Sequence, residues 1–260
     1  STTGLDSIDG LVADEVLVPV GAEGAFCERV VRLEGGHVSF LPATDADEVL
    51  ARPETGEIVF GSFNKLDKTT PEVLSTWAEI LVRRPGSRLV LRSRGLDDPR
   101  VADRFVGLLA EAGVESDRIE CHGWVSHSEL LAGYGEIDIG LDPFPFSGGL
   151  TTCEALWMGV PVVTMPGQIF AHRHSASFLR EVGLTDWVVD TPDQYLRIAE
   201  RYCSDLDSLA GLRADLRHQV GQSPLCDVPR FARNLEIAFR RMWRKWCETR
   251  GKADTLNGAA

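Results

Sequence analysis

The 260-residue sequence has little positive charge, no long apolar run and no charged-then-apolar signal pattern near its first residues. It holds 27 lysines and arginines against 39 aspartates and glutamates, so its formal net charge is −12. A phosphate backbone needs a basic surface, and we therefore expect no nucleic acid as a partner. A membrane-spanning helix needs ~20 consecutive apolar residues, so we expect no membrane partner either.

The six cysteines form no C-x-x-C motif and none lies at zinc-ligand spacing from a histidine. We expect them to be reduced, which favours a cytoplasmic location. No Asp-x-Asp pair stands near a predicted strand end, so we expect no metal and no other cofactor. No Ser-His-Asp, Cys-His or paired-carboxylate set stands out, and the sequence leaves the catalytic base unassigned.

Short apolar runs alternate with longer helical patterns along the chain. This alternation predicts an α/β fold, with a Rossmann-like parallel sheet and helices on both faces. Thr70, Ser126 and Thr191 carry the signals of helix N-caps. The predicted strands are 58–62, 88–92, 119–122, 137–141, 162–164 and 187–189, and the predicted helices are 71–83, 98–112, 126–133, 151–158, 174–182, 192–204, 205–219 and 228–247.

Three polar loops directly follow predicted strands, at residues 64–68, 124–127 and 147–152. The carboxyl ends of parallel strands meet at one edge of a sheet, and ligands bind beyond that edge. Topology alone therefore predicts that these three loops converge on one site.

The segment 142–166, DPFPFSGGLTTCEALWMGVPVVTMP, is the most informative part of the chain. Its glycine pair, Gly148 and Gly149, permits close backbone approach to a phosphate, and a helix N-terminus follows, where the macrodipole favours an anion. Glu154 lies one turn into that helix, within reach of a ribose diol. Strand, glycine loop, hydroxyls, acid and strand together predict a nucleoside-diphosphate site.

This segment resembles the nucleotide-sugar site of GT-B glycosyltransferases, and more narrowly that of the O-GlcNAc transferase and SPINDLY-like group with its bacterial relatives. A second element agrees, since residues 60–68, FGSFNKLDK, resemble the group's F-x-x-F-N-x-x-x-K segment and precede a helix containing Trp77. Further similarity in 11–41, 118–119, 138 and 223–225 extends the resemblance over about residues 10–247. It implies the C-terminal half of a GT-B fold.

The resemblance implies a role for each candidate residue. Lys68 is the catalytic candidate, because the matching lysine stabilises the departing diphosphate, and Glu154 matches the ribose-binding acid. The other implied substrate-binding residues are Asn64, Lys65, Trp124, Val125, Ser126, Ser147, Gly148, Gly149, Leu150, Thr151 and Thr152. Structural alternatives stay open for Asn64 as a turn cap, Lys65 as a solvent-facing residue, the threonines as N-caps and Glu154 as a dipole partner.

Three positions depart from the family pattern. Gly149 stands where the animal enzymes have a histidine, Leu150 where they have a threonine, and Leu130 where a base-proximal histidine lies. His127 is offset by three residues and does not replace the last of these. His172 and His174 are interpreted either as helix-start residues or as contacts to the sugar. The departures weaken any assignment to uridine and N-acetylglucosamine alone.

The expected organisation has four parts: a remnant of the first catalytic lobe at 1–50, the nucleotide-sugar-binding lobe at 51–227, a C-terminal crossing helix at 228–248 and a disordered tail at 249–260. The crossing helix carries an apolar stripe and a solvated basic face. Partners implied by the resemblance are a nucleotide sugar, a protein or peptide acceptor, and a missing N-terminal catalytic lobe that in related enzymes often carries tetratricopeptide repeats. The chain is then an excised domain, a proteolytic core or a truncated gene product.

The resemblance implies an inverting, metal-independent glycosyltransferase that uses UDP-GlcNAc or a related UDP- or GDP-sugar and modifies a protein Ser/Thr or another acceptor. By itself the chain is expected to be incomplete for turnover. One alternative is a non-catalytic nucleotide-binding or regulatory module. The other is a GT-B transferase that acts on a glycan or a small molecule.

Overall fold

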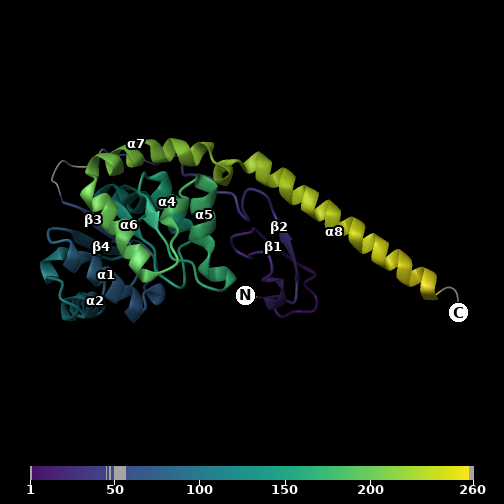
Figure 1. The fold of residues 1–260 in the computed structure, drawn as a ribbon, viewed down its shortest axis with the longest axis horizontal. Helices are drawn as coiled ribbons and strands as arrows, with labels where there is room; N and C mark the ends of the chain where they lie inside the picture. The colour runs from purple at the N-terminus through teal and green to yellow at the C-terminus, as the bar shows by residue number, and fades with distance from the viewer. Residues whose placement is uncertain (1, 45, 47, 50–56, 258–260) are drawn as a thin grey trace.

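The computed structural model describes residues 2–44, 46, 48–49 and 57–257 and contains the predicted parallel sheet (Figure 1). Its five strands lie in the order β5-β4-β3-β6-β7, and every neighbouring pair is parallel. The α/β fold class predicted from the alternating pattern is confirmed. The strands are β3 (Val59–Ser62), β4 (Arg88–Arg92), β5 (Ile119–His122), β6 (Ile139–Leu141) and β7 (Val162–Val163).

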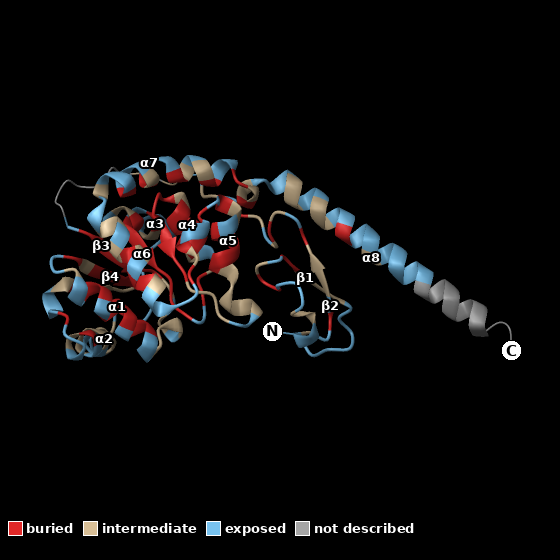
Figure 2. Ribbon diagram, viewed as in Figure 1, coloured by how far each residue is buried: buried red, intermediate tan, exposed pale blue. Residues whose placement is uncertain are grey.

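Helices flank this sheet and enclose an apolar core (Figure 2). Trp77 of α1, Phe60 of β3 and Ile139 of β6 are fully buried in it. The predicted caps are present, since Thr70 accepts a hydrogen bond from Val73 N, while Ser126 and Thr191 begin capping boxes. The helices are α1 (Pro71–Arg83), α2 (Pro99–Glu111), α3 (His127–Gly133), α4 (Leu150–Trp157), α5 (His174–Val182), α6 (Pro192–Ser204), α7 (Leu206–Gln222) and α8 (Val228–Asn257), with short 3₁₀ turns between several of them.

The strand predicted at 187–189 is wrong. Thr185–Trp187 forms a 3₁₀ turn, and Val188 makes only an isolated parallel bridge with Thr164. The reason lies in the 3₁₀ turn itself. Trp187 N donates to Leu184 O at 3.1 Å within that turn, so it is not available to extend the bridge at Val188 into a ladder along β7.

The N-terminal segment 2–44, called the lead-in below, forms its own two-stranded parallel sheet from β1 (Gly10–Ala13) and β2 (Arg29–Arg32). Asp14 fastens it to the lobe. The Asp14 carboxylate accepts hydrogen bonds from Leu17 N at 2.8 Å and from the Ser177 hydroxyl of α5 at 2.6 Å, and it pairs with His37 Nδ1 at 2.9 Å. These bonds hold its pKa at about 2 although burial acts to raise it.

Helix α8 lies along the lead-in and then extends away from the rest of the molecule (Figure 1). Its Asn234 amide donates to Glu34 O at 2.7 Å, and a Cβ built at Gly10 would lie 2.7 Å from Met242 Cε. The rings of Trp243 and Trp246 stack on each other 5.0 Å apart, and Trp243 is 62% exposed.

The helix continues to Asn257, beyond the end expected at 248. The disordered tail expected at 249–260 is therefore wrong for 249–257, while 258–260 lie outside the described residues. A single glycine at 251 does not end the helix, because lysine and alanine on its C-terminal side are good helix formers.

Asp14 gives a pH-dependent prediction. A carboxyl whose pKa is lower in the fold than its usual 3.8 stabilises the fold above that value, and the stabilisation is lost as pH falls toward 2. Asp14→Asn should lower the free energy of unfolding at pH 7 by about 2 kcal/mol. The difference in melting temperature between wild type and variant should then narrow between pH 4 and pH 2.5. Glu15→Gln is the matched control, since Glu15 is exposed; an equal effect of both changes would contradict this role for Asp14.

Candidate nucleotide-sugar site

A cavity of about 1210 Å³ opens at the carboxyl edge of the sheet. The loops after β3, β4, β5 and β6 all reach it, as the topology predicted for three of them. Eight of the thirteen predicted site residues line it: Asn64, Lys65, Lys68, Trp124, Val125, Gly149, Leu150 and Thr151. The other five, Ser126, Ser147, Gly148, Thr152 and Glu154, lie outside its lining.

Lys68 ends a 3₁₀ turn, Leu66–Lys68, just beyond β3. Its ammonium donates a hydrogen bond to Ser147 O at 2.6 Å and lies 4.7 Å from the centre of the Phe146 ring. Burial lowers the pKa of Lys68, and the nearby Asp142 carboxylate opposes that shift. A partly desolvated cation is thus held against the glycine loop, where it would attract an anion more strongly than in water.

The glycine loop is set by Asp142, a residue buried to 1% exposure at the end of β6. Its carboxylate accepts a hydrogen bond from Gly148 N at 2.7 Å and another from the Thr164 hydroxyl at 2.6 Å. Burial raises the pKa of Asp142 to about 6. Gly148 N is therefore bonded to protein, so it serves the loop and is not free to bind phosphate.

Gly148 and Gly149 serve different purposes. A Cβ at Gly148 would lie 2.2 Å from the Thr152 hydroxyl and 2.8 Å from Asp142 Oδ1, so only glycine fits there. At Gly149 a Cβ would meet nothing within 4 Å, and this residue lines the cavity. Open space at Gly149, directly before α4, is where a ligand can approach the helix N-terminus.

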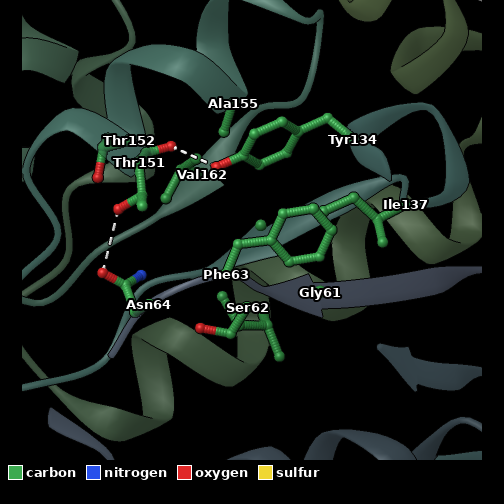
Figure 3. A pocket seen from close by; sticks show the side chains of 12 residues that line it. Gly61, Ser62, Phe63, Asn64, Tyr134, Ile137, Thr151, Thr152, Ala155 and Val162 are labelled. Carbon is green, nitrogen blue, oxygen red and sulfur yellow. Dashed lines mark hydrogen bonds between the residues drawn. The ribbon is translucent and has the colours of Figure 1, made fainter. Parts of the chain in front are cut away.

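The two threonines point in different directions. The Thr151 hydroxyl donates to Asn64 Oδ1 at 3.2 Å, and Figure 3 shows these side chains facing each other across a second, small pocket beneath the loops. The Thr151 carbonyl accepts from the Tyr134 hydroxyl at 2.9 Å. Thr152 is 2% exposed, and its hydroxyl pairs with that of Ser175 at 2.8 Å. Thr151 therefore faces the site, while Thr152 joins α4 to α5.

Glu154 does not lie alone in its helical turn. Its Oε1 lies 2.7 Å from His127 Nε2, with the glutamate 5% exposed and the histidine side chain 58% exposed. Burial raises the pKa of Glu154, and the histidine opposes that shift. The sequence analysis set His127 aside because it lies three residues from position 130, where the family has its histidine. Its position after β5, on the shared sheet edge, was the signal that pointed to it.

The loop after β5 presents Trp124 and Val125 to the cavity, and Trp124 is 61% exposed. Ser126 instead caps α3, because its hydroxyl bonds to the Glu129 carboxylate at 2.6 Å. The Ser126 hydroxyl therefore has a structural role. Of the three residues predicted to contact substrate in this loop, only Trp124 and Val125 line the cavity.

Arg92 and Arg94 line the same cavity, and sequence reasoning missed both. Arg92 is 8% exposed; one of its nitrogens lies 3.1 Å from the Glu136 carboxylate, while its Nε is buried without a partner among the described residues. Arg94 lies with its guanidinium carbon 3.8 Å from the centre of the Trp124 ring. The available signal was their position at the carboxyl end of a predicted strand.

The histidines of the helix-start segment divide between two places. His174 Nδ1 lies 3.1 Å from His37 Nε2, and burial lowers the pKa of His174 to about 4, assisted by the charges of His37 and Lys68. The His172 ring packs edge-on against Phe146, 5.8 Å away. Through Phe146, His172 lies next to Lys68, whereas His174 joins the lobe to the lead-in.

Among the described residues, no three His, Cys, Asp or Glu side chains are grouped so as to hold a metal ion. The helices in the described part of the chain include none long and apolar enough to cross a membrane.

Comparison with known proteins places this chain in a family. The model of glycosyl transferase family 41 matches residues 45–235. A Solanum lycopersicum protein described as a probable UDP-N-acetylglucosamine–peptide N-acetylglucosaminyltransferase SPINDLY is 40% identical over 252 residues, which are 95% of this chain and 27% of that protein. The Caenorhabditis elegans UDP-N-acetylglucosamine–peptide N-acetylglucosaminyltransferase is 32% identical over 190 residues, 73% of this chain and 16% of that protein.

Among solved structures, a mutant of Thermobaculum terrenum O-GlcNAc transferase superposes with a TM-score of 0.88 at 41% identity, over 95% of this chain and 47% of that one. Sucrose-phosphate synthase from Thermosynechococcus elongatus gives a TM-score of 0.57 at 16% identity, covering 91% and 59%, and shares the fold alone. The chain spans about a quarter of the SPINDLY protein's length. It belongs to glycosyltransferase family 41, as a GT-B-type domain of the O-GlcNAc transferase and SPINDLY-like group.

Proposed function

We propose that this chain is the nucleotide-sugar-binding lobe of an inverting, metal-independent transferase that moves a sugar from UDP-GlcNAc, or a related UDP- or GDP-sugar, to a protein Ser/Thr. The observation that carries the proposal is the Lys68 ammonium, held 2.6 Å from Ser147 O beside the glycine loop and within the 1210 Å³ cavity. A fixed cation next to an open helix N-terminus fits a diphosphate that gains charge as its bond to the sugar breaks.

In this proposal the acceptor hydroxyl attacks the anomeric carbon from the face opposite the nucleotide. The bond between that carbon and the diphosphate oxygen breaks, and its electron pair leaves with the diphosphate. Lys68 stabilises this charge, while the N-terminus of α4, around Gly149 and Thr151, holds the phosphate oxygens. The acceptor proton passes to a base outside the described residues, in the first catalytic lobe that the family resemblance implies.

In this proposal the base, the ribose and the diphosphate of the donor contact different loops along the sheet edge. Trp124 and Val125 contact the base, Glu154 binds the ribose, and Asn64 and Lys65 line the approach to the diphosphate. The His127–Glu154 pair adds a constraint, because a ribose hydroxyl has to share the Glu154 carboxylate with an imidazole already 2.7 Å away. His127 then orients the ribose-binding acid.

We propose roles for the lead-in and for α8 as well. The lead-in is a remnant of the first lobe, and α8 crosses back toward that lobe, with the Trp243–Trp246 stack as its contact. A different function, that of a non-catalytic nucleotide-binding module, is favoured by the apolar or glycine residues at 130, 149 and 150. Transfer to a glycan or a small molecule is the remaining alternative for the acceptor.

The first prediction is nucleotide binding by this chain alone. The phosphate site, the cavity and Trp124 all lie within the described residues, so UDP or GDP at 100 times its dissociation constant should stabilise the fold by ~2.7 kcal/mol. Thermal-shift measurements with UDP, GDP, TDP and their sugars test this, with uridine as the control lacking phosphate. If no nucleoside diphosphate shifts the melting curve at millimolar concentration, the site is wrongly assigned.

The second prediction separates turnover from binding at Lys68. In the full-length protein, Lys68→Met should lower kcat by a larger factor than it raises the dissociation constant of the donor. The reason is that the charge Lys68 meets grows in the transition state. Arg104→Met, which removes an exposed cation from α2, is the matched control. Equal losses in rate and affinity would reduce Lys68 to a ground-state contact.

The third prediction concerns metals. Lys68 and the α4 N-terminus supply the positive character that a metal would otherwise bring. Donor binding, measured by calorimetry, should be unchanged in EDTA. A large loss of affinity that magnesium or manganese restores would show that metal-independent binding is wrong.

A further inference from the structure

One guanidinium on the cavity wall is held in place but has no hydrogen-bond acceptor. In the described part of the chain no carboxylate or carbonyl accepts a hydrogen bond from Arg94, and its partner is the Trp124 ring at 3.8 Å. Nearby arginines are paired instead: Arg92 with Glu136, and Arg100 with Asp98. Arg94 therefore keeps its N–H donors available to the cavity.

The position of this pair is built into the loops. Asp97 Oδ1 accepts a hydrogen bond from Trp124 N, which fastens the loop after β4 to the loop after β5. Gly123 makes the contact possible, because a Cβ there would lie 1.5 Å from that same oxygen. Arg94 and Asp97 thus hold Trp124 from two sides, one through its ring and one through its backbone.

A second observation shows that the described residues leave this wall of the cavity short of hydrogen-bond acceptors. Arg92, two residues before Arg94 at the end of β4, is more than nine-tenths buried, and its Nε has no partner among the described residues. Guanidinium groups are donors only, so the wall offers several N–H groups beside the flat Trp124 ring. A ligand that satisfies it is planar and carries acceptor atoms on its edge.

The sheet order places this wall at a distance from the phosphate site. Lys68 and Ser147 follow β3 and β6, whereas Arg94 and Trp124 follow β4 and β5. The two groups are therefore separated by about two strand spacings, ~10 Å. A nucleoside diphosphate with its phosphates at Lys68 extends its base toward Arg94.

We propose that Arg94, held against Trp124, determines base specificity by donating hydrogen bonds to carbonyl oxygens on the base edge. The inference rests on the proposed function, since it takes the ligand to be a nucleoside diphosphate. Uracil and guanine present carbonyl acceptors to such a donor, whereas cytosine and adenine present amino groups at the corresponding positions. Arg94 therefore selects UDP over CDP and GDP over ADP.

The experiment measures dissociation constants of this chain for UDP, CDP, GDP, ADP and inorganic pyrophosphate. The wild-type chain should prefer the carbonyl-bearing member of at least one pair by about tenfold or more, the discrimination typical of a good base-edge contact. Arg94→Gln and Arg94→Lys should both remove most of that preference and leave pyrophosphate affinity unchanged. We expect Arg94→Lys to lose the preference because lysine keeps the positive charge but lacks the planar guanidinium, which can donate two parallel hydrogen bonds. Arg100→Gln is the matched control and should change nothing.

Trp124 supplies a second readout that folding defects cannot imitate. Nucleotide binding should quench tryptophan fluorescence in the wild-type chain, and Trp124→Phe should remove the quench while the chain still binds pyrophosphate. A preference unchanged in both Arg94 variants overturns the inference but leaves the proposed function intact. Equal weakening of all ligands, pyrophosphate included, makes Arg94 a phosphate contact and also overturns it. No binding of any nucleotide or of pyrophosphate removes both proposals.

Discussion

The geometry of the site depends on one buried carboxylate. Asp142 accepts from Gly148 N and from the Thr164 hydroxyl, and its own carbonyl accepts from the Tyr195 hydroxyl at 2.9 Å. These bonds fix the loop whose Ser147 carbonyl holds Lys68. The arrangement costs free energy: burial raises the pKa of Asp142 to about 6, so ionising it at neutral pH costs about 3 kcal/mol relative to an exposed aspartate. The same carboxylate shapes the glycine loop and lies near the Lys68 ammonium.

Much of the architecture could be predicted because its signals are local. Strand and helix alternation gave the parallel sheet, and the capping residues Thr70, Ser126 and Thr191 marked helix starts that the structure contains. The failures have physical reasons. The strand expected at 187–189 does not form because Trp187 N donates to Leu184 O inside a 3₁₀ turn. The end of α8 was expected at 248, but the helix continues through residue 251 to Asn257 because the lysine and alanine that follow are good helix formers.

The site was only partly predictable, because side-chain direction depends on tertiary contacts. Thr151 and Thr152 are adjacent and chemically identical, yet one faces Asn64 at the cavity and the other faces Ser175 in the interior. Sequence alone cannot separate them. Arg92, Arg94 and His127 were missed because their importance comes from partners far along the chain: Glu136, Trp124 and Glu154. Only the sheet order brings these partners to one edge.

Helix α5 gives the lead-in a mechanical connection to the glycine loop. Ser177 of α5 donates to Asp14 in the lead-in, and two residues earlier Ser175 contacts both the Thr152 hydroxyl and, at 3.5 Å, Ser147 Oγ. The Ser175 and Ser177 hydroxyls are both buried and lie within the first turn of α5. A force that displaces the lead-in must therefore either break the Asp14 contacts or move α5 as well. If α5 moves, it displaces Ser147, whose carbonyl accepts the hydrogen bond from Lys68. Helix α5 therefore links the lead-in directly to the glycine loop beside the large cavity.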